Sequence, residues 1–246
     1  MQLILILIVN LLVGACVGLT GIAGFLLPMF YTGFLGMPAV QSLALSFAAF
    51  LISGIFGSFN YYKAGNLDLK TAGILSAGSF AGALLGVQVN LLIPEDIVKI
   101  ILYMVVLLSG ISILLRKNPQ TTTREKKGNP ILYLLLGLIT GAICAASGAG
   151  GPILVMPLLT VIGFPVHMAV GISLFDSIFI AIPSVAGYLY HSAADSKLLL
   201  LLPVILIVHA IGVIFGSKNA VKINQNLLKR IVAIASILIA CMKLLT

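Results

Sequence analysis

Long apolar runs follow one another along almost the whole of this 246-residue chain. A helix needs about 20 consecutive apolar residues to cross the hydrocarbon core of a bilayer. Because only 8% of the residues are charged and 61% are hydrophobic, the chain is far more apolar than a soluble domain. The pattern predicts an all-α, polytopic membrane protein. Its apolar segments lie at about 3–19, 25–35, 39–61, 71–92 and 97–115, and again at about 131–147, 152–163, 166–190, 198–216 and 227–245.

The second five segments repeat the first five, at an offset of 127 residues as far as Asp68 and Asp195 and, after a short insertion, with Gly82-x-x-x-Gly86 matching Gly212-x-x-x-Gly216. We interpret this match as an internal duplication into two homologous halves. A first membrane repeat is predicted at 1–115, a cytoplasmic hinge at 116–130 and a second membrane repeat at 131–246. The matched pairs include Gly14 and Gly141, Gly24 and Gly151, Ser46 and Ser173, and Tyr61 and Tyr188.

Each half opens with an apolar run that is interrupted by small residues. Residues 147–152 read Ser-Gly-Ala-Gly-Gly-Pro, and the weaker copy at 20–25 reads Thr-Gly-Ile-Ala-Gly-Phe. Glycine and proline weaken a helix, and irregular backbone at membrane depth survives only where it faces protein or a wet cavity. We therefore predict a Gly-broken helical hairpin in each half, with a second short helix beginning near Phe25 or Pro152, and a cavity beside the breaks. The sequence leaves open whether the hairpin segments span the membrane fully or are re-entrant.

The distribution of basic residues indicates how the two halves are oriented. If each hairpin enters and leaves on one face, the halves are inverted, and only Lys99, Lys197 and Lys243 of the 14 Lys and Arg residues lie outside. If instead each half has four full spans, the halves are parallel and five basic residues lie outside. Cytoplasmic loops carry an excess of Lys and Arg, so the charges favour inverted repeats, a recurrent plan among transporters.

The breaks are the predicted binding site for a small anion. A helix that begins at a break offers unpaired N–H groups and the positive end of its dipole, and both favour an anion. In the alternative interpretation the glycines only let the hairpin turn tightly or the helices pack closely. The predicted substrate-binding residues are Thr20, Gly21, Gly24, Ser147, Gly148, Gly150 and Gly151, together with Ser46 and Ser173 from the following segments.

Two ionisable residues inside apolar segments are candidates for proton coupling. Asp176 is the one acidic residue deep in such a segment, and Ala49 stands at the matching position of the first half. His209 lies in the middle of segment 198–216. Ionisable groups at membrane depth are expensive and are treated as functional by default, although both could instead form interhelical hydrogen bonds that only fix packing.

The duplicated chain, its two Gly-rich breaks and the Gly-x-Pro that follows each of them resemble the TauE/SafE family of sulfite and organosulfonate exporters. The resemblance covers nearly the whole chain. It implies a multi-pass permease of the cell inner membrane that exports small sulfur-containing anions such as sulfite or sulfonates. By position, the Gly-rich stretches of the family correspond to residues 20–24 and 147–151. The first copy has lost part of its glycine run, so we expect it to contribute less.

The leading hypothesis is therefore a secondary transporter of small anions, with proton coupling. A cation or metal-ion permease built on Asp176 is an alternative, and so is a membrane-embedded enzyme or a structural membrane subunit. We expect no enzyme, because the sequence has no triad order, phosphate loop or paired buried carboxylates. Neither a metal site nor a cofactor is expected. The net charge of +8 is carried by loops between spans and indicates orientation rather than a nucleic-acid partner, which leaves a small anion and the lipid bilayer as the expected partners. The anion, the direction of transport, the coupling ion and the oligomeric state stay open.

Overall fold

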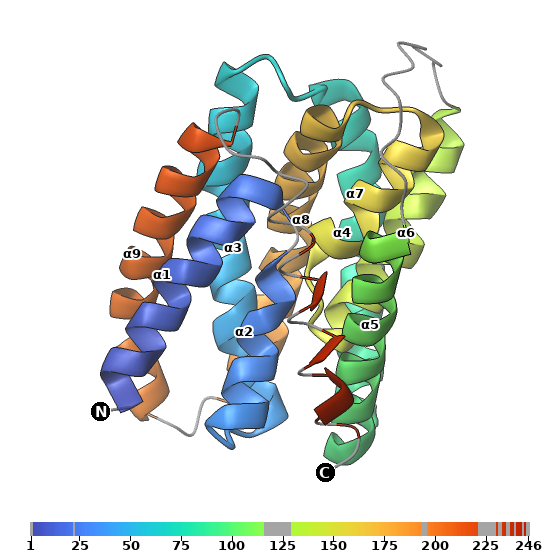
Figure 1. Ribbon diagram of the computed structural model, residues 1–246. Helices are drawn as coiled ribbons and strands as arrows, with labels where there is room; N and C mark the ends of the chain where they lie inside the picture. Colours follow the sequence, from blue (N-terminus) through green and yellow to red (C-terminus); the bar gives the residue numbers. More distant parts are fainter. Residues whose placement is uncertain are drawn as a thin grey trace.

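The computed structural model describes residues 2–21, 23–115, 129–192 and 196–220, and single residues between 230 and 244. Every element in the described part of the chain is a helix, which confirms the all-α prediction. Most of the predicted hinge, and much of the last predicted segment, fall outside the described residues. The long helices are α1 (Gln2–Thr20), α3 (Ala39–Lys63), α4 (Leu69–Leu92), α5 (Glu95–Leu115), α6 (Pro130–Ser147), α8 (Val166–Ser192) and α9 (Ser196–Asn219) (Figure 1).

Six helices in the described residues are long and apolar enough to cross a membrane. Each half also contains one shorter apolar helical segment directly after its break. In the first half this segment consists of η1 (Ala23–Phe25), α2 (Leu26–Met29) and the π-helical η2 (Phe30–Phe34), and in the second it is α7 (Gly151–Ile162). With 12 residues, α7 is about 18 Å long and is too short to cross the hydrocarbon core of about 30 Å. The six candidate membrane spans are Leu3–Thr20, Ala39–Lys63, Leu69–Leu92, Pro130–Ser147, Val166–Ser192 and Leu202–Asn219.

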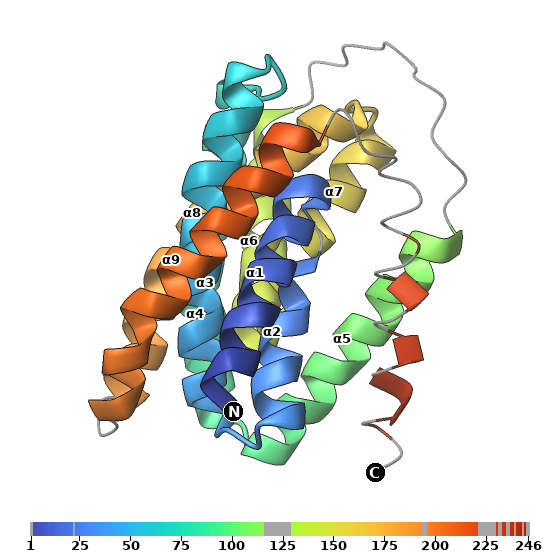
Figure 2. The same ribbon diagram turned by 60° about the vertical axis from the view of Figure 1, so that its left-hand side comes forward.

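The two halves make equivalent contacts. Helix α1 packs along α9 and α6 packs along α4, while α3 and α8 pack on each other between these two pairs (Figure 2). Single hydrogen bonds repeat as well: the Tyr61 hydroxyl donates to the Gly18 carbonyl at 3.5 Å, and the Tyr188 hydroxyl donates to the Ala145 carbonyl at 2.8 Å. The duplication inferred from sequence therefore corresponds to a repeated packing pattern.

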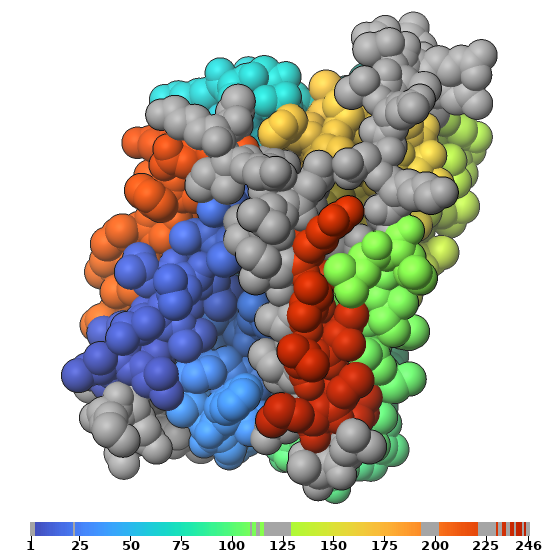
Figure 3. Space-filling model, in the orientation of Figure 1, coloured from blue at the N-terminus to red at the C-terminus, as the bar shows by residue number. Residues whose placement is uncertain are grey.

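Glycines determine how closely the paired helices approach. A Cβ atom on Gly82 of α4 would overlap the carbonyl oxygen of Leu138 in α6, and one on Gly216 of α9 would overlap that of Ala15 in α1. Such backbone-to-backbone contact is the usual role of small residues in membrane helix packing. A similar contact joins α5 to the C-terminal region, where Gly110 faces Ala233 and Ile237, and these segments lie side by side on the surface in Figure 3.

Corresponding helices of the two halves run in opposite directions. Gly14 and Gly18 of α1 lie beside His209 and Val213 of α9, so these two helices are parallel. Ser53 and Asn60 of α3 bond to residues 209 and 217, so α3 is parallel to α9 as well. By the same comparison α6, α4 and α8 are mutually parallel, and they run opposite to the first three (Figure 1). These directions support the predicted inverted repeat. How the two halves are oriented in the membrane stays a prediction.

The glycine contacts give a first test within a single helix. Gly82→Ala should lower the stability of the protein by about 1 to 3 kcal/mol, because the added methyl forces α4 and α6 apart. Gly73→Ala, also in α4, is the control: its Cβ would meet nothing within 4 Å, and replacing glycine in a helix adds up to about 1 kcal/mol of stability. Melting temperatures in detergent should separate the two variants, and equal melting would contradict this account of the packing.

The helix directions give a second test, of topology. Lys63 and Lys218 end the parallel helices α3 and α9, whereas Lys99 lies near the start of α5 at the opposite end of the bundle. In a variant without native cysteines, Lys63→Cys and Lys218→Cys should be protected from an impermeant thiol reagent added to whole cells, and Lys99→Cys should react. Labelling of position 218 from outside would show that the inverted orientation is wrong.

Candidate functional site

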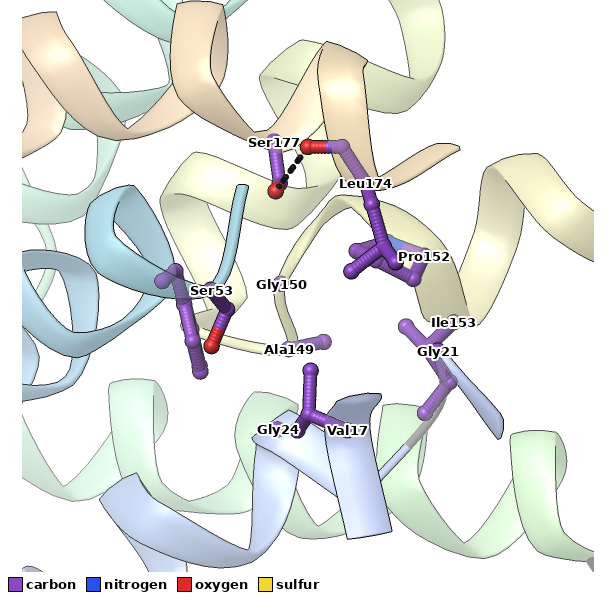
Figure 4. Close-up of a pocket in the computed structure, with 11 residues that line it drawn as sticks. Val17, Gly21, Gly24, Ser53, Ala149, Gly150, Pro152, Ile153, Leu174 and Ser177 are labelled. Atoms are coloured by element: carbon purple, nitrogen blue, oxygen red, sulfur yellow. Dashed lines mark hydrogen bonds between the residues drawn. The ribbon is translucent and has the colours of Figure 1, made fainter. Parts of the chain in front are cut away.

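The structure brings the two Gly-rich breaks together around one small cavity of about 10 Å³, which is room for about one water molecule (Figure 4). Gly21 and Gly24 border it from the first break, and Ala149, Gly150 and Pro152 border it from the second. Segments that are 127 residues apart in the sequence therefore share one site. Helices α1, α3, α7 and α8 supply its other walls through Val17, Phe50, Ser53, Ile153, Leu174 and Ser177.

The second break has a backbone path that only glycine adopts easily. Helix α6 ends at Ser147, and Gly148 follows in the left-handed conformation with φ 72°, its N–H donating to the Cys144 carbonyl. Gly150 has φ 79° and ψ 147°, and α7 begins at Gly151 with Pro152 in its first turn, as predicted. The first N–H groups of a helix have no carbonyl partner within it. The beginning of α7 therefore presents hydrogen-bond donors at the edge of the cavity.

The first break is built differently. Gly21 is left-handed with φ 76°, and its N–H donates to the Val17 carbonyl at 2.7 Å. The expected short helix near Phe25 begins as a 3-10 turn, and the α-helical part that follows is only four residues long. The two breaks thus border the same cavity with unequal backbone geometry, and the smaller contribution expected of the first copy stays a prediction.

An aromatic ring lies between the two breaks. A Cβ atom added to Gly24 would meet the Phe50 ring from one side, and a Cβ atom on Gly150 would meet it at 3.2 Å. The sequence did not single out Phe50. At the repeat offset it corresponds to Ser177, which lines the same cavity, so the offset was a signal that could have found it.

Two hydroxyl groups reach the cavity wall, and both already have a partner. Ser177 donates to the Leu174 carbonyl at 2.7 Å, as Figure 4 shows. The Oγ atom of Ser53 lies 2.7 Å from Nε2 of His209. Among the described residues that line the cavity, none carries a charge. The site is therefore a neutral space edged by backbone, hydroxyls and apolar side chains.

Comparison with known proteins identifies the family of this chain. Residues 6–242 match the family described as "Sulfite exporter TauE/SafE". The chain belongs to the TauE/SafE family. It is 29% identical over 242 residues to a probable membrane transporter protein of Methanocaldococcus jannaschii, with 91% of this chain and 86% of the relative covered. It is 24% identical over 202 residues to one of Bacillus subtilis, with 79% and 82% covered. No solved structure matches significantly.

These matches make the protein a multi-pass membrane transporter rather than an enzyme. The matches give no function to individual residues, so the binding site predicted from the sequence stays a prediction. Of the predicted anion-binding residues, Gly21, Gly24 and Gly150 line the cavity. Gly148 and Gly151 lie just outside its lining, against Leu43 and Ile180.

The four predicted hydroxyl ligands are directed elsewhere. All four side chains are buried, and none is among the residues that line the cavity. Each donates instead to a carbonyl of its own helix, a common local use of serine and threonine. The pairs are Thr20 with Cys16, Ser147 with Ile143, Ser46 with Ser42, and Ser173 with Val170.

The two ionisable candidates lie on different helices and have different neighbours. Asp176 is fully buried on α8 and faces Ser79 and Ser76 of α4. The two serine hydroxyls and both carboxyl oxygens have no hydrogen-bond partner in the described part of the protein. His209 is fully buried on α9 and is bonded to Ser53. Among the described residues, no group of three or more His, Cys, Asp or Glu could hold a metal ion.

The glycine geometry at the second break gives a test with an internal control. Gly150→Ala and Gly65→Ala both place a side chain at positive φ, which costs on the order of 1 to 3 kcal/mol and more at Gly150, whose ψ of 147° lies outside the left-handed helical region. Only the Cβ at position 150 also meets Phe50, because position 65 has nothing within 4 Å. Both variants should therefore melt earlier, but only Gly150→Ala should lose transport in proteoliposomes, with sulfite as the probe anion. Normal transport by Gly150→Ala would mean that the breaks are only turns.

Proposed function

We propose that this protein is a secondary transporter that exports small sulfur-containing anions, sulfite or sulfonates, with coupling to protons. The observation that carries the proposal is the meeting of both breaks at one uncharged cavity. Family membership supports the substrate class. In this proposal the cavity is the anion site, and the two halves move relative to each other to open it to either side of the membrane.

The chemistry of the cavity suits a weakly held oxyanion. Backbone N–H groups at the start of a helix, together with hydroxyls, form anion sites without a cationic side chain. A transported ion must be bound strongly enough to enter and weakly enough to leave. A buried Lys or Arg would hold an anion tightly, but the described lysines at positions 63, 70, 99 and 218 all lie at helix ends.

Proton coupling is proposed from the two buried ionisable groups, Asp176 and His209. An ionised carboxylate without a partner is expensive in an apolar interior. A proton on Asp176 would remove this charge and let the carboxyl group donate to a neighbouring serine of α4. Because the carboxyl group of Asp176 faces the hydroxyls of Ser79 and Ser76, and oxygen is the ligand of hard cations, a cation-coupled transporter is the second candidate.

Binding to the purified protein tests the substrate class. Sulfite, thiosulfate, sulfoacetate and taurine are each added to the purified protein in increasing amounts. The melting temperature in each is compared with that in chloride at the same ionic strength. A specific ligand stabilises by RT ln(1 + [L]/Kd), or about 2.7 kcal/mol at 100 times Kd. At least one of these anions should stabilise the protein in this way. Stabilisation by Na⁺ or a divalent cation alone, with none by the anions, would favour the cation transporter.

Asp176→Asn tests the coupling. The variant keeps the size of the side chain but cannot exchange a proton, so a pH gradient should no longer drive sulfoacetate transport in proteoliposomes. Asp96→Asn is the matched control, because Asp96 is exposed in the first turn of α5 and should leave gradient-driven transport intact. If Asp176→Asn responds to the gradient as the wild type does, Asp176 only fixes packing.

A further inference from the structure

A chain of hydrogen bonds connects the cavity wall to the centre of α1. Ser53 of α3 lines the cavity and is 1% exposed, and its Oγ lies 2.7 Å from Nε2 of His209. The other ring nitrogen, Nδ1, lies 3.1 Å from the backbone carbonyl oxygen of Asn10. Both His209 and Asn10 are fully buried. The imidazole ring is thus held between the Ser53 hydroxyl at the cavity and the Asn10 carbonyl in the centre of α1.

The partners of the ring fix its hydrogen positions. A backbone carbonyl can only accept, so Nδ1 of His209 must carry a hydrogen. In the neutral ring Nε2 then carries none and must accept. The Ser53 hydroxyl has a single hydrogen, and it donates this hydrogen to Nε2. While His209 is neutral, Ser53 therefore has no donor left for a ligand in the cavity.

Protonation of His209 reverses the bond to Ser53. Nε2 then carries a hydrogen and donates to Oγ of Ser53, which accepts it with a lone pair. The hydroxyl hydrogen of Ser53 is released and can turn toward the cavity that this residue lines. We propose that His209 is a proton switch that converts Ser53 into a hydrogen-bond donor for the anion, so that one proton and one anion load together. This inference rests on the proposed anion transport through the cavity.

Electrostatics favour joint loading over either event alone. The residues that line the cavity carry no charge, so an anion there would be an uncompensated charge in a medium of low dielectric constant. An imidazolium at position 209 without the anion would be equally isolated. Together they are separated by one serine side chain, and the imidazolium offsets one unit of the negative charge of the anion. By linkage, the proton strengthens binding of the anion as much as the anion strengthens binding of the proton.

The elements packed against α9 supply no other countercharge. Helix α1 contains no Asp, Glu, Lys, Arg or His, and the charged residue of α3, Lys63, lies at its C-terminal end. At the far side of the network Asn10 donates to the Tyr31 hydroxyl at 2.7 Å. Asp176 faces α4 rather than α9. Helices α1 and α3 also contain three titratable residues that are neutral when protonated, namely Cys16, Tyr61 and Tyr62.

The proton can reach the ring through the same hydroxyl. Ser53 passes its hydrogen to Nε2 and takes one from a hydronium ion in the open cavity, which leaves as water, so the protein gains one proton in total. Release of the anion reverses the transfer. The second half lacks an equivalent relay: the residue that corresponds to His209 in the repeat is Ser79, and Ile180 corresponds to Ser53. The switch therefore occurs once per chain and contributes one proton for each anion that binds.

Calorimetry measures this ratio directly. Thiosulfate and sulfoacetate, whose charges are constant between pH 6 and 8, are titrated into the purified protein in two buffers that differ in ionisation enthalpy. The wild type should take up about one proton per anion, and its affinity should rise about tenfold for each unit by which the pH falls. His209→Gln, which cannot gain the proton, should bind more weakly with no proton uptake and no pH dependence.

Three serine variants separate the switch from simple packing. Ser53→Ala removes the donor and should lose both affinity and proton uptake, whereas Ser53→Thr keeps a hydroxyl and should restore both. Ser177→Ala is the matched control. It removes the other cavity hydroxyl, which donates to its own helix, so it should lower affinity at most and keep the proton uptake.

The outcomes distinguish this inference from the function on which it rests. If neither anion binds the wild type, the proposed function and the switch both fail. If the anions bind but His209→Gln takes up protons as the wild type does, the switch is wrong and anion transport stands. If His209→Gln does not fold, Ser53→Ala provides the same test.

Discussion

The need to satisfy every backbone N–H and C=O group away from water governs this protein. It explains why every described element is a helix and why the two places where helices break lie against each other. A break that faced lipid would leave polar groups without partners. At the centre of the bundle, the same groups border a cavity. The constraint that limits the fold therefore also creates a place where a polar ligand can be held.

Close helix contacts keep this centre closed. Glycines let α1 approach α9, and α6 approach α4, until backbones touch. These two pairs leave α3 and α8 packed against each other between them. Ser53 and Ser177, the two hydroxyls at the cavity, come from these central helices. Any relative movement of the two halves would shift both walls, as alternating access requires.

Charge is distributed in a way that fits this arrangement. The described basic residues lie at helix ends, while the lining of the cavity is neutral. In the proposed transport, an anion in this space is held by dipoles and hydroxyls, and a proton that arrives with it balances part of its charge. The two buried ionisable groups proposed to carry that proton, His209 and Asp176, have different surroundings. The former bonds to a group in the wall, and the latter faces an adjacent helix.

The sequence alone determined the membrane class, the helical segments, the duplication, the start of α7 and the family, because each depends on composition, local backbone preference or spacing along the chain. It could not show that the breaks share one cavity, that Phe50 lies between them, or that the hydroxyls of Thr20 and Ser147 turn back to their own helices. The physical reason is that such a sequence does not specify how each helix is rotated about its own axis. In a helix that is apolar on all sides, the residues that face lipid and those that face protein are of the same types. Only the glycine contacts between segments far apart in sequence set which face of each helix points toward the centre.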